Sequence, residues 1–254
     1  MKLLPKRRER PTAMTVVEHL EELRGRLFIS LIAIAIGAIG GWFLFGPVMD
    51  ALRKPFCEAV STLPPSSQPL TGCSLVFNGV VEPLIIKFKV VAFIGLGIAL
   101  PVVLWEFWAF VTPGLTKSER KMAIPFVASS VCLFALGGWF AFMTLPRGLN
   151  FLLGFAGEGF TAMLTASRYV GFVMMLTLAF GLSFEFPLVL IFLGKVGVVK
   201  SRQLRDVRRF AILGIAIFAA VITPSQDPYS MTAMMLPMIL FYEVAIIVIR
   251  LMKR

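Results

Sequence analysis

The sequence is poor in charged residues and in the side chains that most enzymes use. Charged residues make up 15% of its 254 positions and hydrophobic residues 58%, whereas a water-soluble domain normally carries about 25% charged residues. One soluble core cannot bury so much apolar surface. The composition therefore excludes an ordinary water-soluble globular domain.

Histidine and cysteine are scarce as well, with one and three residues. The single histidine, His19, precedes a long apolar segment, and we expect it on the surface. The chain has no Gly-x-Ser-x-Gly, no His-Glu-x-x-His and no phosphate-binding glycine loop, which mark common hydrolases, zinc proteases and nucleotide-binding proteins. We therefore expect no enzymatic activity, no metal site and no cofactor.

Long apolar runs are what the chain has instead. Stretches with little or no charge lie at 27–45, 90–111 and 122–145. At 1.5 Å per residue, a helix of that length crosses a hydrocarbon core about 30 Å thick. The sequence therefore predicts an all-α, polytopic membrane protein with six spans, at 27–46, 88–111, 122–145, 169–194, 210–223 and 230–249.

We expect one membrane domain over 1–254, with no appended soluble domain. Its parts are an N-terminal segment with an amphipathic helix (1–26), a six-span bundle (27–250) and, within it, a long extracytoplasmic loop (47–87). Most of the 25 basic residues fall in 1–26, 112–121, 195–209 and 250–254. Basic residues favour the cytoplasmic side of a membrane, so both termini are expected there. The net charge of +11 then reflects anionic lipid and not nucleic acid.

Two of the three cysteines, Cys57 and Cys73, fall in the predicted outer loop. In an oxidising compartment they can form a disulfide, which would stabilise the protein by about 3 kcal/mol. Two free thiols are the alternative. Cys132 lies in the third predicted span and is expected to pack as a small apolar side chain.

The segment HLEELRGRL (19–27) places acids directly before the first apolar run. Apolar residues at helical spacing predict a helix lying at the membrane interface. Glu22 and Arg26 are four residues apart and Glu21 and Arg24 three apart, so each pair can form an ion pair on that helix. Alternatively, these carboxylates can bind a cationic ligand.

A second acid, Glu119, follows the second predicted span. Its position suits the N-terminal turn of the third span, where a carboxylate stabilises the helix dipole. Glu22 and Glu119 are also expected on the same face of the membrane, where together they can bind a cationic ligand, above all the planar guanidinium of arginine.

Glu185 lies near the middle of the fourth predicted span. A charged carboxylate there is costly, which makes a functional role the first hypothesis; a protonated side chain bonded to a neighbouring helix is the alternative. Pro187, two residues later, is expected to kink the helix. Glu106 and Glu243 lie nearer the span ends, where snorkelling toward water can satisfy them.

Four segments in order resemble one protein family: HLEELRGRL (19–27), PVVLWEFWAFVTPGLTKSERK (101–121), FGLSFEFPLVL (180–190) and ITPSQDPYSMTAMMLPMILFYE (222–243). The chain is similar to the TatC family, the multi-span component of the twin-arginine, Sec-independent protein translocase. The resemblance implies a glove-shaped bundle of six helices, the fifth and sixth of them short, in the plasma membrane of a prokaryote. It also implies a receptor for the twin-arginine signal peptides of folded cargo. Its implied partners are the single-span proteins TatA and TatB and further copies of itself, and transport would use the proton-motive force.

The resemblance also assigns roles to individual residues. By resemblance, Glu22 and Glu119 hold the twin arginines, and Arg24, Arg26 and Phe110 shape that site. A second group contacts partner helices: Glu185, Asp227 and Met231. Two prolines, Pro55 and Pro83, are structural. Met231 stands where some members have a glutamine.

Two other functions are compatible with a polytopic chain of this kind. One is a proton-coupled transporter of small solutes that uses Glu185 as the proton carrier. Such folds usually contain internal repeats, and none is evident in the sequence. The other is a membrane scaffold without a ligand.

Overall fold

The computed structural model describes residues 16–63, 68–69, 71–111, 123–155, 163–225 and 227–252. Helices make up nearly all of this part of the chain. It also contains an isolated parallel β-bridge between Val76 and Thr165. Five helices are long and apolar enough to cross a membrane: Val17–Thr62, Glu82–Val111, Ile124–Gly154, Ala166–Val196 and Pro228–Leu251. The predicted fold class, an all-α polytopic membrane protein, is confirmed.

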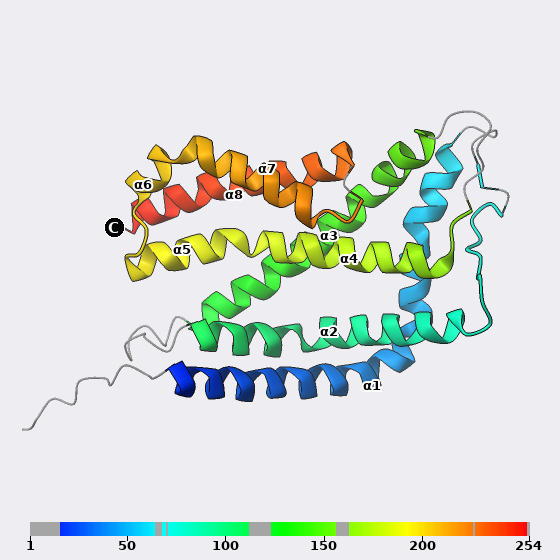
Figure 1. Cartoon of the computed structure of the whole chain (residues 1–254), viewed down its shortest axis with the longest axis horizontal. Helices are drawn as coiled ribbons and strands as arrows, with labels where there is room; N and C mark the ends of the chain where they lie inside the picture. The colour runs from blue at the N-terminus through cyan, green and yellow to red at the C-terminus, as the bar shows by residue number, and fades with distance from the viewer. Residues whose placement is uncertain are drawn as a thin grey trace, which may run out of the picture.

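The first three helices are α1 (Val16–Thr62), α2 (Glu82–Val111) and α3 (Ala123–Gly154). Figure 1 shows α1 and α2 side by side along the long axis, while the second half of α1 turns away from it and α3 crosses obliquely. α1 contains Pro47 and Pro55, and proline kinks a helix because it lacks an amide hydrogen and crowds the preceding turn. We call the end with the start of α1 and the end of α8 the terminal end, and the other the disulfide end.

Residues 47–62 are helical, although we predicted that a loop begins at position 47. The first apolar run, 27–45, stops just before this point, and the predicted span was ended there. Yet an apolar stripe continues at helical spacing and packs into the bundle: Leu52, Phe56, Ala59, Val60 and Leu63 are all buried. Burial of that stripe outweighs the local signals. The outer connection to α2 is correspondingly shorter than predicted.

The start of α1 also differs from the expected interfacial helix. Val16 is the first residue of a helix that continues without a break through the apolar run, and Figure 1 shows this half of α1 as one straight rod. The segment with Glu22 and Arg26 is therefore the beginning of the helix that contains the first span, and not a separate helix lying along the membrane interface.

The fourth predicted span is divided into α4 (Ala166–Phe184) and α5 (Phe186–Val196), which meet at Glu185. Pro187 interrupts the hydrogen-bond ladder there, as expected for proline inside a helix. α5 ends at Gly197, whose φ of +85° is a left-handed conformation that glycine adopts without strain. The segment that follows contains a short helix, α6 (Ser201–Asp206).

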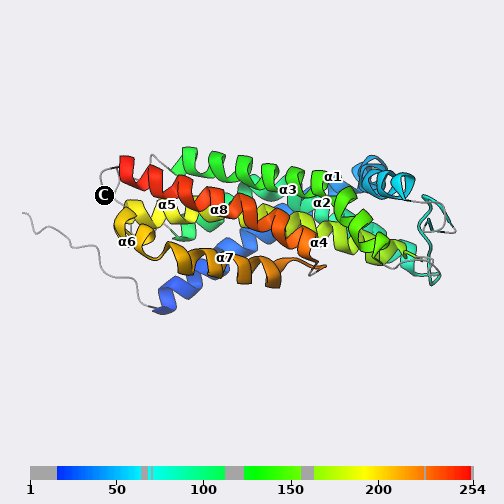
Figure 2. The ribbon, with the colours of Figure 1, turned by 90° about the horizontal axis from the view of Figure 1, so that it is seen from above.

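The last two helices are α7 (Arg208–Ile222) and α8 (Pro228–Leu251). With 15 residues α7 is short, as predicted, and in Figure 1 its turn into α8 ends before α3 and α4 do. The expectation of a short final helix is wrong, because α8 has 24 residues. Asp227 caps its first turn and Pro228 fits the position that needs no amide hydrogen. Seen from above, α8 lies between α3 and α7 (Figure 2).

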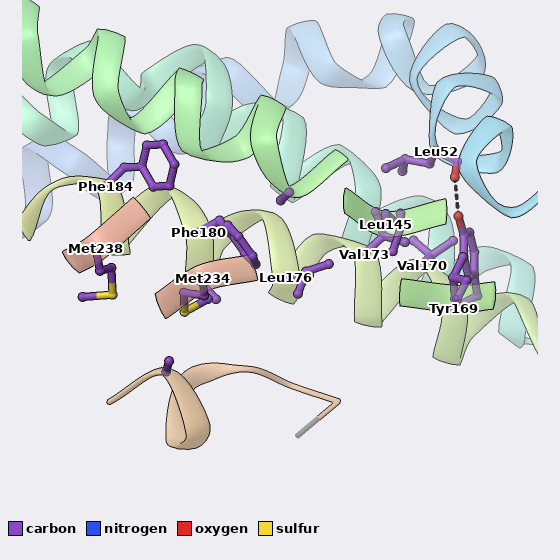
Figure 3. Close-up of a cluster of buried hydrophobic side chains, with 14 of the residues drawn as sticks. Leu52, Leu145, Tyr169, Val170, Val173, Leu176, Phe180, Phe184, Met234 and Met238 are labelled. Carbon is purple, nitrogen blue, oxygen red and sulfur yellow. Dashed lines mark hydrogen bonds between the residues drawn. The ribbon is translucent and has the colours of Figure 1, made fainter. Parts of the chain in front are cut away.

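The main core lies around α4 and contains buried side chains of α1, α2, α3 and α8. Figure 3 shows part of it, with Val170, Val173, Leu176 and Phe180 of α4 among the labelled side chains. The same view shows the hydroxyl of Tyr169 donating to the carbonyl oxygen of Leu52, at 2.8 Å. α4 is therefore the central helix of the bundle, against which the main core is built.

Small residues allow the closest helix contacts. A Cβ atom built on Gly37 of α1 would lie 2.5 Å from the carbonyl oxygen of Gly95 in α2, and one on Gly137 of α3 would lie 2.6 Å from that of Phe180 in α4. Contacts this short leave room only for hydrogen, so glycine lets the backbones meet. The α1–α2 pair, which carries the first candidate site, is fixed in this way.

Candidate functional site

At the terminal end, one arginine joins two carboxylates from different helices. The guanidinium of Arg26 donates to Oε1 of Glu22 on the same helix, at 2.6 and 3.0 Å, and to Oε2 of Glu106 on α2, at 2.9 Å. Glu22 and Arg26 face each other because residues four apart lie on one side of a helix. Glu106 reaches them because α1 and α2 pack side by side. The three side chains make one cluster, which we call the Arg26 cluster.

The Arg26 cluster is half-buried and carries one negative charge in excess. The side chains of Arg26, Glu22 and Glu106 are 25%, 22% and 14% exposed, so water screens them less than it screens an open surface pair. The second oxygen of Glu22, Oε2, is buried and accepts no hydrogen bond in the described part of the chain. The cluster can thus accept a further hydrogen-bond donor, preferably a cationic one.

Aromatic rings border the cluster. His19 stacks on Phe110, with ring centroids 4.4 Å apart and ring planes 12° from parallel, and Nδ1 of His19 lies 3.9 Å from Oε2 of Glu22. The side chain of His19 is 43% exposed, and its ring also packs against the site. Phe110 is brought there by the end of α2. Together the rings form an apolar wall beside the carboxylates.

The other acidic and basic residues of this segment behave differently. Among the described residues Arg24 and Glu21 form no ion pair; the guanidinium of Arg24 lies over the ring of Phe28, 5.7 Å from its centroid. Both Glu21 and Arg24 are exposed. Glu119, the second carboxylate expected at this site, lies outside the described residues.

Glu185 is part of a polar chain inside the bundle. Its Oε2 accepts from the hydroxyl of Ser130 on α3, at 2.5 Å, and the oxygen of Ser130 accepts from the indole N–H of Trp108 on α2, at 3.1 Å. Oε1 of Glu185 is buried and accepts no hydrogen bond in the described chain. The chain links α2, α3 and the α4–α5 junction.

Aromatic side chains pack around Trp108, at one end of this polar chain. Trp108, Phe126 and Phe192 meet edge to face, with centroids 5.1–6.2 Å apart. The indole that donates to Ser130 is therefore packed among apolar rings. A carboxylate in apolar surroundings must be neutral or paired, and Ser130 is the partner that the structure provides.

Asp227 and Met231 lie at the beginning of α8. The carboxylate of Asp227 is buried, with its residue 4% exposed; it accepts from the backbone N–H of Ser230 at 2.7 Å and from the hydroxyl of Ser225. This is the geometry of an N-cap. Met231 is half-buried and packs against the main core.

The remaining expected residues lie at the disulfide end. Cys57 and Cys73 are joined by a disulfide, with Cα atoms 4.9 Å apart. Cys132, in the first part of α3 and away from this end, is free and exposed and does not pack into the bundle as expected. Pro55 is buried inside α1, and Pro83 is an exposed residue in the first turn of α2. Beside Pro83, Glu82 accepts from the backbone N–H of Asn78 at 2.6 Å and from that of Ser167 in α4 at 3.2 Å.

Three residues of these sites were not expected from the sequence. Glu106 was assigned to snorkelling, His19 to the surface, and Ser130 to no role. The polar character of Glu106 inside an apolar run is a signal that a partner exists, but its partner is 80 residues away. Ser130 offers a weaker signal, since serine is common inside membrane helices.

The comparisons with known proteins agree with the resemblance drawn from the motifs. The family model described as Sec-independent protein translocase protein (TatC) matches residues 18–237. A TatC of Frankia casuarinae is 42% identical over 92% of this chain, which spans 65% of that relative's length. A TatC of Aquifex aeolicus is 36% identical, over 95% of this chain and 97% of the relative.

The fold agrees as well. A crystal structure of the twin-arginine translocase receptor TatC superposes with a TM-score of 0.73 at 36% identity, and the match covers 93% of this chain and 100% of that one. The matched family model, the relatives and the shared fold extend over nearly the whole sequence. The chain belongs to the TatC family of multi-pass membrane proteins.

Proposed function

We propose that this chain is the receptor subunit of a twin-arginine protein translocase, a transport protein without catalytic activity. Its ligand is the signal peptide of a folded cargo protein, recognised by its two consecutive arginines. Membership of the TatC family supports the proposal. The observation that carries it is the pair of carboxylates, Glu22 and Glu106, held around a guanidinium at the terminal end.

The chemistry of the Arg26 cluster suits an arginine ligand. A guanidinium is planar and can donate two parallel hydrogen bonds to a carboxylate, which an ammonium group cannot. Glu22 and Glu106 already bind one guanidinium at 2.6 and 2.9 Å, that of Arg26. Because the cluster has one negative charge in excess, it attracts a cation. We infer that a peptide arginine takes over part of the coordination that Arg26 provides in the free protein.

Neighbouring residues extend this binding surface. Glu119, in the connection between α2 and α3, adds a carboxylate for the second arginine. The stacked rings of His19 and Phe110 offer a face to the flat guanidinium or to its aliphatic stem. Arg24 is directed to Phe28, and we assign it the weaker role of limiting which cations approach.

The terminal end is proposed to face the cytoplasm of a prokaryote, because most basic residues flank the spans on that side. In this orientation the protein meets signal peptides before transport. Single-span partners of the TatA and TatB type and further copies of this chain complete the translocase, which uses the proton-motive force. We propose Glu185 and Met231 as contacts for a partner helix. Asp227 contributes by holding the start of α8.

A proton-coupled transporter of small solutes is the weaker alternative. It rests on Glu185, whose carboxylate is bonded to Ser130 among aromatic side chains. No comparison favours such a transporter, and the family match extends over most of the chain. Solute uptake into proteoliposomes that depends on Glu185 would support the alternative.

The central experiment compares two signal peptides that differ only in their basic pair. A photocrosslinker placed at position 118, which leaves Glu119 intact, should capture the Arg-Arg peptide, whereas a Lys-Lys peptide, which keeps the charge but loses the planar fork, should crosslink and bind far less. Equal binding of the two peptides would contradict guanidinium recognition.

Neighbouring glutamates of α1 provide a matched pair of variants. Glu22→Ala removes a carboxylate of the Arg26 cluster and should weaken binding of the Arg-Arg peptide by roughly 10- to 100-fold, the equivalent of one hydrogen bond between charged groups. Glu21→Ala removes the same charge from an exposed position one residue away and should change binding little. Equal losses would show that only the overall charge matters.

A further inference from the structure

Two grooves at the disulfide end share one arginine. The first, of about 340 Å³, lies between α3 and α8, with Arg147 and Met143 on one wall and Tyr229 and Leu236 on the other. The second, of about 390 Å³, lies between α3 and the second half of α1. Arg147 and Met143 line both grooves. A single ridge of α3 therefore separates two adjacent grooves that have the same guanidinium at their border.

The walls of these grooves are largely apolar and open outward. Trp139, Met143 and Leu236 are 60%, 53% and 59% exposed, on helices long enough to span the membrane. Trp139 lines the second groove, and tryptophan is enriched at the level of lipid headgroups. Side chains exposed in this way meet acyl chains when the protein is in a bilayer.

Polar recognition in the first groove falls to Arg147 and Tyr229. The hydroxyls of Thr144 and Thr232 also line it, but each donates to a carbonyl oxygen of its own helix, at 3.1 and 2.6 Å. They have no hydrogen left for a ligand. The guanidinium of Arg147 has five donors in a planar fork that matches a phosphate.

The charge around the grooves is positive. Arg147 and Lys54, which both line the second groove, take part in no ion pair in the described part of the chain. Nearby Arg53, in contrast, is paired with Asp50 at 2.8 Å. Glu58 lines the second groove as well, so two cations and one carboxylate leave one positive charge in excess. A ligand with one negative charge would neutralise it.

We propose that this site binds one anionic glycerophospholipid. Its phosphate lies on Arg147, with Lys54 nearby, and its two acyl chains occupy the two grooves on either side of the Met143–Arg147 ridge. The two grooves correspond to two chains, the single guanidinium to one phosphate, and the excess charge to one net negative charge. The site is separate from the Arg26 cluster, and the proposal does not depend on signal-peptide binding.

The test measures bound lipid and not transport. The full chain is placed in nanodiscs of phosphatidylcholine containing a minor fraction of phosphatidylglycerol, released into mild detergent, and examined by native mass spectrometry. We expect one phosphatidylglycerol to remain per chain. Arg147→Gln should lower its retention about fivefold or more, as expected for the loss of one cation near a phosphate, and Arg147→Lys should lower it less.

Two further variants separate this site from general effects. Arg168→Gln removes a charge from another exposed arginine, at the start of α4, and should leave retention unchanged. Ala233→Trp fills the groove between α3 and α8 without altering charge, and should reduce retention while the melting temperature stays near that of the parent protein.

Three results would overturn the proposal. The first is equal retention of phosphatidylcholine, and the second is an equal loss in Arg147→Gln and Arg168→Gln. The third is displacement of the bound lipid by millimolar inorganic phosphate, which would identify a simple anion site.

Discussion

The two ends of the bundle are held together by different kinds of contact. At the terminal end, α1 and α2 meet through charged side chains, with Arg26 between Glu22 and Glu106. At the disulfide end, a covalent bond between Cys57 and Cys73 ties α1 to the connection that follows it, and helices are joined by side chains that bond to the backbone.

The backbone contacts at the disulfide end leave little freedom to exchange partners. Glu82 accepts from the amide of Ser167 at the start of α4, and Tyr169 donates to the carbonyl oxygen of Leu52. A backbone group keeps its place as long as its helix does. A charged side chain can change partners without moving its helix. The difference therefore separates an end suited to ligand exchange from an end that maintains the fold.

The largest expected effect comes from breaking the covalent link. Cys57→Ser should lower the free energy of unfolding by about 3 kcal/mol, because the loop of 16 residues is no longer closed in the unfolded chain. The loss is measured by chemical denaturation followed by circular dichroism. Binding of the Arg-Arg peptide should not change, since the two ends are separate. Cys132→Ser, at an exposed free cysteine, is the matched control.

The next effect concerns the Arg26 cluster. Glu106→Gln replaces a charged acceptor of Arg26 and should lower the free energy of unfolding by about 2 kcal/mol. It should also weaken binding of the Arg-Arg peptide, because the cluster loses its excess negative charge. Peptide titration and denaturation of the same sample test both. A variant that loses stability but binds the peptide normally would remove Glu106 from the proposed site.

A smaller effect is expected at the disulfide end. Tyr169→Phe removes the hydroxyl that donates to Leu52 and keeps the packed ring, so it should cost about 1 kcal/mol of stability. Peptide affinity should stay within experimental error. A clear change in affinity would show that the two ends are coupled through α4.

The smallest effect serves as a reference for the terminal end. Arg208 and Glu243 form an ion pair at 2.8 Å, with side chains 45% and 37% exposed. An exposed pair contributes about 0–1 kcal/mol, so Glu243→Gln should change stability by less than 1 kcal/mol. If Glu243→Gln lowers the free energy of unfolding as much as Glu106→Gln does, partial burial does not make the Arg26 cluster more stabilising than an exposed pair.

Local contacts at the candidate site could be predicted from the sequence, and contacts between distant segments could not. The pairing of Glu22 with Arg26 follows from their spacing on one helix. The Glu21–Arg24 pair has suitable spacing too, but an aromatic ring at Phe28 competes for the guanidinium. Glu106 joins Arg26 only because α1 and α2 pack together, and one sequence does not reveal that register.

The fold shows the same division. Apolar runs predicted the five helices that are long enough to span a membrane, whereas the sixth predicted span, 210–223, corresponds to the shorter α7, which is not among the five. Pro187 predicted the break at Glu185. The helical stripe of Leu52, Phe56 and Val60 was present in the sequence, yet it follows the end of the uncharged run and was assigned to a loop. Only its burial in the main core decides between the two, and that depends on tertiary packing.

The length of α7 has a consequence for the surrounding lipid. As a helix, its 15 residues extend about 22 Å, some 8 Å less than a typical hydrocarbon core. A bilayer adapts to a short segment by becoming thinner next to it, at a cost of a fraction of a kcal/mol per Å. The bilayer beside α7 should therefore be thinner than elsewhere around the protein, with shorter or more disordered acyl chains. A polar segment that crosses the membrane next to α7 would then have less hydrocarbon to cross.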